Sequence, residues 1–418
     1  MRICIVADST SYRFGGEAIL PAHYFSRLRA RGEEVWLVAH ARTRKELEAA
    51  FPDDHDRLRL IPDSWIHRFL FRIGTYLPRR VAESTVSLLS VLITQCLARK
   101  IVLALRDQEC IDVVHQPVPV APRFPSLLFG LGIPVVIGPM NGGMEYPPGF
   151  RKMESPISRV SVRMGRAVSN FANRLLPGKK LASVLMVANE RTRLSLPHGC
   201  RGEIVELPEN GVDLTTWAAP RQHAASARAR FVFIGRLVDF KRLDIAIEAL
   251  RQVPDADLEV IGDGPMRTAW EQFAHTCGVA PRVKFLGWRT QPECALHLQA
   301  ATALVMPSVW DCGGAVVLEA MAAAVPVIAA RWGGPADYLD KTSGILVEPD
   351  SAAALVTGFT SAMQQLSAAP EVARNMGLNG QQRVRVHFDW DRKIDAVLSI
   401  YRRAVAAEAA VNRVVAEI

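Results

Sequence analysis

Two cations in the second half of the sequence stand where an open α/β sheet would bind an anion. The apolar run FVFIG predicts a strand ending at Gly235, and Arg236 and Lys241 lie between this strand and the next predicted helix. Ligands of such sheets bind outside the carboxyl ends of the strands, and two cations there suit a diphosphate. A solvated basic loop is the simpler interpretation of the same pair.

A second loop carries glycines in place of cations. In the segment MPSVWDCGGAVVLEAM the predicted strand ends near Pro307, Gly313 and Gly314 follow, and a helix is predicted from Ala315. The first N–H groups of a helix have no partner within it, so the amides of Ala315 and Val316 can bind phosphate without any side chain.

Two carboxylates belong to this second loop and its helix. Asp311 precedes the glycine pair, and Glu319 follows two turns into the predicted helix. In these places they can accept hydrogen bonds from sugar hydroxyls. Glycosidases also use two carboxylates, but here one of them would be fixed in a helix beside a phosphate-binding loop, so we prefer sugar binding.

Short apolar runs alternate with helical patterns along the whole chain, which predicts parallel sheets covered by helices. The runs fall into two series, RICIVAD, EVWLVAH, IDVVHQP, PVVIGPM and LMVAN, then RFVFIGR, LEVIGDG, RVKFLG, TALVMPS and PVIAA. A polar, Ala-rich stretch separates them, so a domain boundary is predicted within 207–228. Two doubly wound α/β domains facing each other would place a ligand cleft between them.

The composition is that of a folded globular protein with an excess of positive charge. Of the 418 residues, 49% are hydrophobic and 22% charged, which excludes a disordered chain. Lys and Arg number 50 against 42 Asp and Glu, and the net charge of +8 favours an anionic partner. Nucleic acid is excluded as that partner, because no recognition motif or aromatic–basic interleaving is present.

The cysteines and the N-terminus predict a cytoplasmic location. The 7 cysteines are scattered without a C-x-x-C pair, which argues against disulfides or a structural zinc site. The start, MRICIVADST, lacks the features of a signal peptide. The longest uncharged stretch, 84–98, is shorter than the roughly 20 apolar residues of a membrane span.

The segment 151–180 is strongly basic. Its apolar residues recur at spacings of three and four and so predict an amphipathic helix: Ile157, Val160, Met164, Val168, Phe171 and Leu175. The upstream segment WIHRFLFRIGTYLPRR also mixes Arg with large apolar residues. Helices packed on the first sheet are one interpretation. Peripheral attachment to an anionic membrane at the inner face of the cell is the other.

The motifs of the second half, taken in order, resemble the retaining glycosyltransferases of family 4, which have the GT-B fold and use nucleotide-sugar donors. The segments that carry the resemblance are GRLVDFKRLDIAIEAL, VIGDGP, VKFLGW, MPSVWDCGGAVVLEAMAAAVPVIA and GILVEP. In the first half it continues through the glycine loop at 15–16, ENGVD and IGPMNGG. The segment IGPMNGGMEYPPGF, with its Tyr, Pro pair and Phe, resembles an acceptor-side loop of some exopolysaccharide branches of the family. The C-terminal HFDWDRKIDAVLSIYRRA is similar to the family's helix that returns to the first domain.

The resemblance implies three parts: an acceptor-binding Rossmann-like domain at 1–207, a nucleotide-sugar-binding domain at 208–388 and a returning helix at 389–418. It also implies the roles of individual residues. Arg236 and Lys241 match the cations that hold the donor diphosphate. Glu319 matches the glutamate expected to hold the donor ribose, and Asp311 stands where the family contacts donor-sugar hydroxyls.

Further contacts follow from the same resemblance. His115 matches a histidine near the sugar and acceptor, and Asn141 and Gly142 lie in an acceptor-side loop. The remaining donor contacts are expected from glycine loops, a helix start and one strand end: Gly15, Gly16, Gly235, Gly313, Gly314, Ala315, Val316, Trp288 and Arg289.

The sequence departs from the family at one place that matters for the donor. Positions 311–314 read D-C-G-G where the family usually has E-G-F-G, and the shorter Asp311 puts the identity of the donor sugar in doubt. The mechanism implied is retention of anomeric configuration without a metal or cofactor, with a nucleoside-diphosphate sugar as co-substrate. The acceptor expected is a glycan or a lipid-linked saccharide.

Two other classes of function stay open at this point. A nucleotide-sugar epimerase or an NAD-dependent oxidoreductase would use a similar sheet. However, Arg267 stands where the dinucleotide fingerprint would need a third glycine after Gly262 and Gly264, and Ala7-Asp8-Ser9 replaces the glycines expected after the first strand. A catalytically silent nucleotide-sugar-binding module is the other alternative, for which Asp311 is the one indication.

Overall fold

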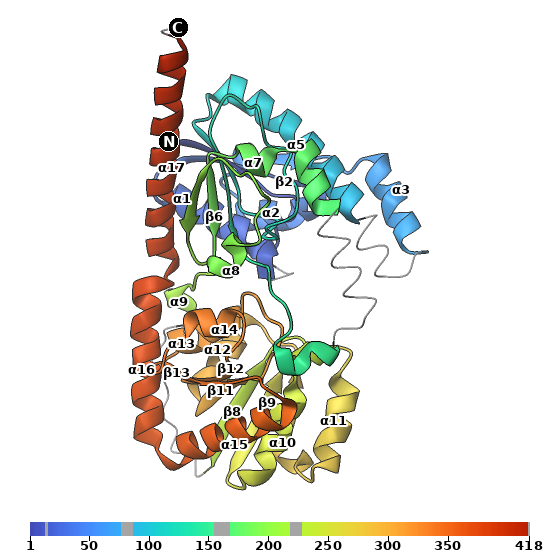
Figure 1. The fold of residues 1–418 in the computed structure, drawn as a ribbon, viewed down its shortest axis with the longest axis vertical. Coiled ribbons are helices and arrows are strands. Elements are labelled where there is room, and N and C mark those ends of the chain that lie inside the picture. The colour runs from blue at the N-terminus through green and yellow to red at the C-terminus, as the bar shows by residue number, and fades with distance from the viewer. Residues whose placement is uncertain (13–15, 77–86, 154–167, 218–227, 417–418) are drawn as a thin grey trace. The chain divides into compact units, whose positions relative to one another are not determined.

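The computed structural model describes residues 1–12, 16–76, 87–153, 168–217 and 228–416 (Figure 1). It divides into two compact units. Unit 1 comprises Met1–Gly143, Ser161–Glu209 and Lys393–Ile418, and unit 2 comprises Met144–Val160 and Asn210–Arg392. None of the helices in the described ranges combines the length and the apolar character that a membrane crossing needs.

Unit 1 is built on a seven-stranded parallel sheet in the order β3-β2-β1-β4-β5-β6-β7 (Figure 1). Its strands are β1 (Arg2–Val6), β2 (Glu34–His40), β3 (Leu58–Ile61), β4 (Val113–Gln116), β5 (Val135–Met140), β6 (Val184–Val187) and β7 (Glu203–Glu206). Almost every residue of the inner strands is buried, because helices cover both faces. The helices include α1 (Leu20–Ala30), α2 (Arg44–Ala50), α3 (Trp65–Gly74), α5 (Ser87–Glu109), α7 (Gly178–Leu181) and α8 (Glu190–Arg193).

Unit 2 repeats this plan with a six-stranded parallel sheet in the order β10-β9-β8-β11-β12-β13. Its strands are β8 (Ala229–Ile234), β9 (Ala256–Ile261), β10 (Val283–Gly287), β11 (Ala303–Met306), β12 (Val327–Ala330) and β13 (Gly344–Val347). The helices include α9 (Leu214–Trp217), α10 (Leu243–Ala249), α11 (Arg267–Thr276), α12 (Gln291–Gln299), α13 (Ala315–Ala322), α14 (Gly334–Tyr338), α15 (Ala352–Ala368) and α16 (Pro370–His387).

The alternation of strand residues gives unit 2 a core on each face of its sheet. Phe231 and Phe233 of β8 pack in the core that holds α10 and α15. Val232, between them, packs in the opposite core with α12 and α13. Successive strand side chains point to opposite faces, so a continuous apolar run fills both cores at once.

The last helix, α17 (Trp390–Ala416), begins in unit 2 and continues in unit 1 from Lys393 onward. Within unit 1 it is fixed by buried polar contacts. The ammonium of Lys393 donates to the carbonyl of Glu209. The Tyr401 hydroxyl, on a ring with no exposed surface, donates to Nδ1 of His115 at 2.7 Å.

The segment that follows β5 does not stay with the first unit. The sequence predicts a single domain over 1–207, but Met144–Val160 belong to unit 2. Phe150, only 3% exposed, packs in the core with α10 and α15, and the Arg242 guanidinium lies 5.0 Å from the centre of its ring. This burial of an aromatic side chain is the physical reason for the correction. We call the described part, 144–153, the strap.

Replacing Phe150 by Ala should lower the free energy of unfolding of unit 2 by about 3–5 kcal/mol, because a large buried side chain is lost and leaves a cavity. The measurement is denaturant unfolding of the full chain, followed by tryptophan fluorescence. Phe171→Ala, at a phenylalanine 62% exposed, is the control and should change little. Equal stability of the Phe150 variant and the wild type would contradict the assignment of the strap to unit 2.

Candidate functional site

The candidate site lies at the carboxyl ends of β8 and β11, which are neighbours at the centre of the second sheet. The chain leaves β8 toward β9 on one side and leaves β11 toward β12 on the other, so the order of strands reverses between them. A crevice opens at such a point, because the two connections diverge. The two predicted loops, 235–242 and 307–314, are the ones that flank it.

An ion pair joins these two loops. The Lys241 ammonium donates to Oδ2 of Asp311, and both side chains are 16% exposed. Lys241 ends the short helix η6 (Asp239–Lys241), and Arg242 follows in the left-handed conformation at φ 50°, bonded to Asp244. Arg236 is exposed at the start of the same loop. The structure thus brings together two of the predicted residues, one cation and one carboxylate.

Glycines let the loop after β8 lie directly against the loop after β9. A Cβ on Gly262 would stand 2.0 Å from the Gly235 carbonyl oxygen, and one on Gly264 would stand 2.4 Å from that of Leu237. Both glycines have positive φ, 131° and 157°, which side chains rarely adopt. The G-D-G turn therefore supports the loop that carries Arg236.

The N-terminus of α13 lies beside Asp311. Gly314 caps the helix in the left-handed conformation, φ 58°, and its N–H donates to Oδ1 of Asp311 at 3.0 Å. The amides of Ala315 and Val316 come next, at the positions where a helix offers no carbonyl. One carboxylate therefore contacts both the cation of the first loop and the helix start of the second.

Glu319 lies one turn and a half further along α13 and is partly buried. Burial raises the pKa of its carboxyl to about 7. The side chain is therefore divided between the protonated and the ionised form near neutral pH. Only the ionised form has all its oxygen lone pairs free to accept hydrogen bonds from sugar hydroxyls.

Residues 216–383, which include all of these loops, match the family described as glycosyl transferases group 1. We call this matching part of the chain the group 1 domain. The D-inositol 3-phosphate glycosyltransferase of Mycolicibacterium paratuberculosis is 31% identical over 229 residues, 51% of this chain and 51% of the relative. The chain thus spans about half the length of the curated relatives it matches.

Solved structures are similar over nearly the whole chain. Sucrose-phosphate synthase from Thermosynechococcus elongatus covers 97% of this chain and 100% of its own, at a TM-score of 0.66 and 20% identity. Anabaena HepE, in complex with UDP, covers 96% and 100%, at a TM-score of 0.66 and 15% identity. These similarities concern the fold, and they confirm the predicted GT-B architecture of two Rossmann-like α/β domains.

The strap, whose Tyr and Phe the sequence predicts in an acceptor-side loop, contacts Trp310 and Trp332, which the sequence did not mark as site residues. The Tyr146 ring packs against that of Trp310, with centroids 4.6 Å apart, next to Asp311. The indole N–H of Trp332 donates to the Glu145 carbonyl at 2.8 Å. A Cβ on Gly333 would stand 2.2 Å from the Asp311 carbonyl oxygen. Trp310 beside Asp311, and Trp332 before the glycine pair at 333–334, were the available signals.

Two other predicted donor contacts lie at the end of β10. Trp288 is 69% exposed, and the Arg289 guanidinium donates to its carbonyl at 3.0 Å. An exposed indole after a strand of the group 1 domain is available to stack on a base.

Gly313 precedes the α13 cap, and its carbonyl would be 2.3 Å from a Cβ on Gly334.

His115 does not have the placement expected of it. The sequence predicts its ring at the strand edge, facing a cleft, but the residue lies within β4 and has no exposed surface. Its Nε2 donates to the Gly138 carbonyl at 2.6 Å, and its Nδ1 accepts from Tyr401. Burial lowers its pKa to about 4. With both nitrogens engaged, His115 links β4, β5 and α17, so its predicted placement facing a cleft is wrong.

The other predicted residues of unit 1 are in loops. Asn141 is buried, and the Gly142 N–H donates to Thr192 Oγ1 at 3.1 Å. A Cβ on Gly142 would stand 2.6 Å from the Pro122 ring, so close packing explains that glycine. Gly16 has a φ of 56° with open space around it, and Gly15 lies outside the described residues.

The raised pKa of Glu319 gives a test of its surroundings. Since its usual value is 4.5 and its folded value about 7, the folded state binds the extra proton, and the wild type loses stability as pH rises between these values. Glu319→Gln should therefore be more stable than the wild type by up to about 3 kcal/mol at pH 8, with little difference near pH 4.5. Denaturant unfolding at both pH values measures this.

Glu371→Gln, at an exposed position of α16, is the matched control and should show no such pH-dependent gain. A Glu319→Gln variant that is less stable than the wild type at pH 8 would show that the carboxyl is not desolvated as described.

Proposed function

We propose that this protein is a glycosyltransferase that moves a sugar from a nucleoside-diphosphate sugar to a hydroxyl acceptor. One observation carries the proposal. Within a group 1 domain, Lys241, Asp311 and the start of α13 are joined at the point where the strand order reverses. A cation, helix amides and a sugar-binding carboxylate are what a nucleotide sugar requires in one place.

The chemistry that these residues would perform concerns the leaving group. As the glycosidic bond breaks, negative charge grows on the diphosphate, and the cations of Lys241 and Arg236 with the α13 amides would stabilise it. We propose that they do so without a metal. Transfer with retention then follows if the acceptor hydroxyl attacks from the side on which the diphosphate departs, and a donor phosphate oxygen takes its proton.

Glu319 and Asp311 would orient the donor. The ionised Glu319 carboxylate would accept from ribose hydroxyls, and Asp311 from those of the sugar. Of the proteins named above, Anabaena HepE is in complex with UDP, which supports a nucleotide-sugar donor in general without indicating the sugar. A glycan or lipid-linked saccharide is the acceptor we propose, in polysaccharide or glycolipid synthesis.

We also propose peripheral binding to an anionic membrane through unit 1. Three apolar side chains of α3 form one exposed stripe, Trp65 at 69%, Phe69 at 54% and Ile73 at 37%. Tyr76, just beyond the helix, extends the stripe and is 84% exposed. Arg68 and Arg72 are exposed on the same helix. Apolar and basic side chains together suit the interface of an anionic bilayer.

The basic segment 151–180 supports the same proposal where it is described. In the helical residues 168–175, Val168, Phe171 and Leu175 are 54%, 62% and 64% exposed. These are three of the apolar positions from which the amphipathic helix was predicted, and they do not pack on the sheet. Ile157, Val160 and Met164 lie outside the described residues.

The donor site is tested by two substitutions at the ion pair. Lys241→Ala should lower kcat/KM for sugar transfer about 100-fold or more, because the leaving diphosphate loses a cation. Asp311→Asn frees Lys241 from its partner. The variant protein should therefore bind a nucleoside diphosphate about fivefold more tightly, a gain of about 1 kcal/mol, whereas sugar transfer should become slower. Calorimetry with UDP and GDP, and turnover of a nucleotide-sugar panel, measure these effects.

Lys284→Ala, at an exposed lysine of β10, is the control and should behave as the wild type. Binding of nucleotide sugars without any turnover or hydrolysis would favour a silent binding module. Full activity of Lys241→Ala would contradict the site, and product sugars epimerised without transfer would contradict the reaction class.

The membrane proposal is tested on α3. Trp65→Ser with Phe69→Ser should weaken sedimentation with vesicles containing anionic phospholipid at least tenfold, because two large apolar side chains no longer insert. Leu378→Ser, at an α16 leucine 47% exposed, is the matched control and should bind as the wild type does. Wild-type protein that fails to sediment at low salt would overturn the proposal.

A further inference from the structure

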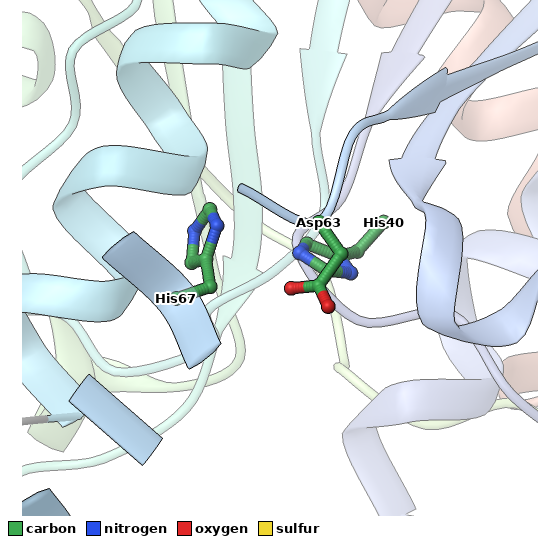
Figure 2. Close-up of side chains that lie close together, drawn as sticks. All are labelled: His40, Asp63 and His67. Atoms are coloured by element: carbon green, nitrogen blue, oxygen red, sulfur yellow. The ribbon is translucent and has the colours of Figure 1, made fainter. Parts of the chain in front are cut away.

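We propose that His40, Asp63 and His67 of unit 1 form a binding site for a zinc ion. One nitrogen from each histidine and one oxygen from Asp63 lie within 4.8 Å of one another. Figure 2 shows the three side chains converging from different directions. The site is separate from the donor site, whose residues belong to unit 2, and it does not depend on the proposed transferase reaction.

A strand end, a loop and a helix start bring these residues together. His40 is the last residue of β2, Asp63 lies in the loop after β3, and His67 is in the first turn of α3. Both histidines are buried, at 2% and 6% exposure, whereas Asp63 is exposed. Two fixed imidazoles beside a carboxylate on a short loop provide a set of ligands typical of zinc sites.

The hydrogen bonds of His67 determine which of its ring nitrogens carries the lone pair that a metal would need. Thr94 Oγ1 donates to the Ser90 carbonyl at 2.9 Å, so it accepts at 3.0 Å from Nε2–H of His67. The lone pair is therefore on Nδ1, which faces the other two side chains and accepts from the Ser64 hydroxyl at 2.9 Å and the Ser64 amide at 3.3 Å. For zinc to bind there, these contacts with Ser64 must open. A hydrogen-bonded distal nitrogen fixes ring and tautomer in the manner of metal-bound histidines.

His40 supplies a nitrogen that lacks a partner. Its Nδ1 accepts from the Arg42 amide at 3.2 Å, whereas Nε2 is buried without any hydrogen bond among the described residues. A buried polar atom left unpaired is costly and calls for a ligand. For zinc to bind there, the ring proton must transfer from Nε2 to Nδ1, and the long contact with the Arg42 amide must open.

The distances between the three ligand atoms fit zinc if the side chains move slightly closer together. Ligands about 2.1 Å from a tetrahedral ion stand roughly 3.4 Å apart, so the atoms have to approach by up to about 1.4 Å. Asp63, on an exposed loop, has the freedom for that movement. With three protein ligands, the fourth position of the ion would be taken by water.

A bound ion would connect the edge of the sheet to α3. It would tie the end of β2 and the loop after β3 to the first turn of the helix that carries the exposed apolar stripe. Zinc should therefore slow amide exchange over residues 61–74, because opening this part would require release of the metal.

The test uses the full chain, treated with a chelator and titrated with Zn²⁺ against a competing chromophoric chelator. We expect one zinc ion per chain, bound more than tenfold more weakly by Asp63→Ala and by His67→Asn. Asp63 is exposed, so its variant is expected to fold whether or not the buried His67 variant does. Hydrogen exchange over 61–74 should slow with zinc in the wild type and not in Asp63→Ala.

Two controls separate this site from other zinc ligands. His275→Ala removes an exposed histidine of α11, and Cys96→Ser with Cys110→Ser removes two exposed thiols. Both should retain the zinc ion and its effect on exchange. The proposal is overturned if the wild type binds no zinc, if Asp63→Ala binds it as tightly as the wild type, or if the cysteine variant loses it.

Discussion

The strand order of the second sheet is the constraint on which the site depends. All its strands are parallel, so every carboxyl end lies at one edge, and the order reverses between β8 and β11. The two loops that leave this point would diverge without a further contact. The pair between Lys241 and Asp311 joins them, and Asp311 also accepts from the Gly314 amide. A cation, a carboxylate and a helix start thus share one place.

Close backbone contacts then hold the two loops, 235–242 and 307–314, in place. Glycines at 262 and 264 let the turn after β9 pack against the loop of Arg236, and glycines at 333 and 334 let the next turn pack against Asp311. In each case a Cβ would stand within 2.5 Å of a carbonyl oxygen. The strap adds the Tyr146 ring, which packs against Trp310 next to Asp311. Residues distant in sequence therefore determine where the short Asp311 side chain lies.

Much of this could be predicted from the sequence because the signals are local. Continuous apolar runs mark strands buried on both faces, and glycines before a helix mark an anion-binding end. Roles that depend on distant partners could not be predicted. His115 has the position of a site residue in the sequence, but Tyr401, far along the chain, takes its second nitrogen. The strap follows a strand of unit 1, but Phe150 finds its core in unit 2.

The sequence by itself determined that the chain forms two parallel α/β domains, and that Arg236, Lys241, Asp311, Gly314 and Glu319 stand at strand ends and a helix start. These follow from periodicity and turn chemistry, which act over a few residues. The tertiary structure decided which of them meet. It paired Lys241 with Asp311, buried His115, raised the pKa of Glu319 to about 7, and gathered His40, Asp63 and His67. Burial and long-range contacts determine these properties, and neither is encoded within a short stretch of chain.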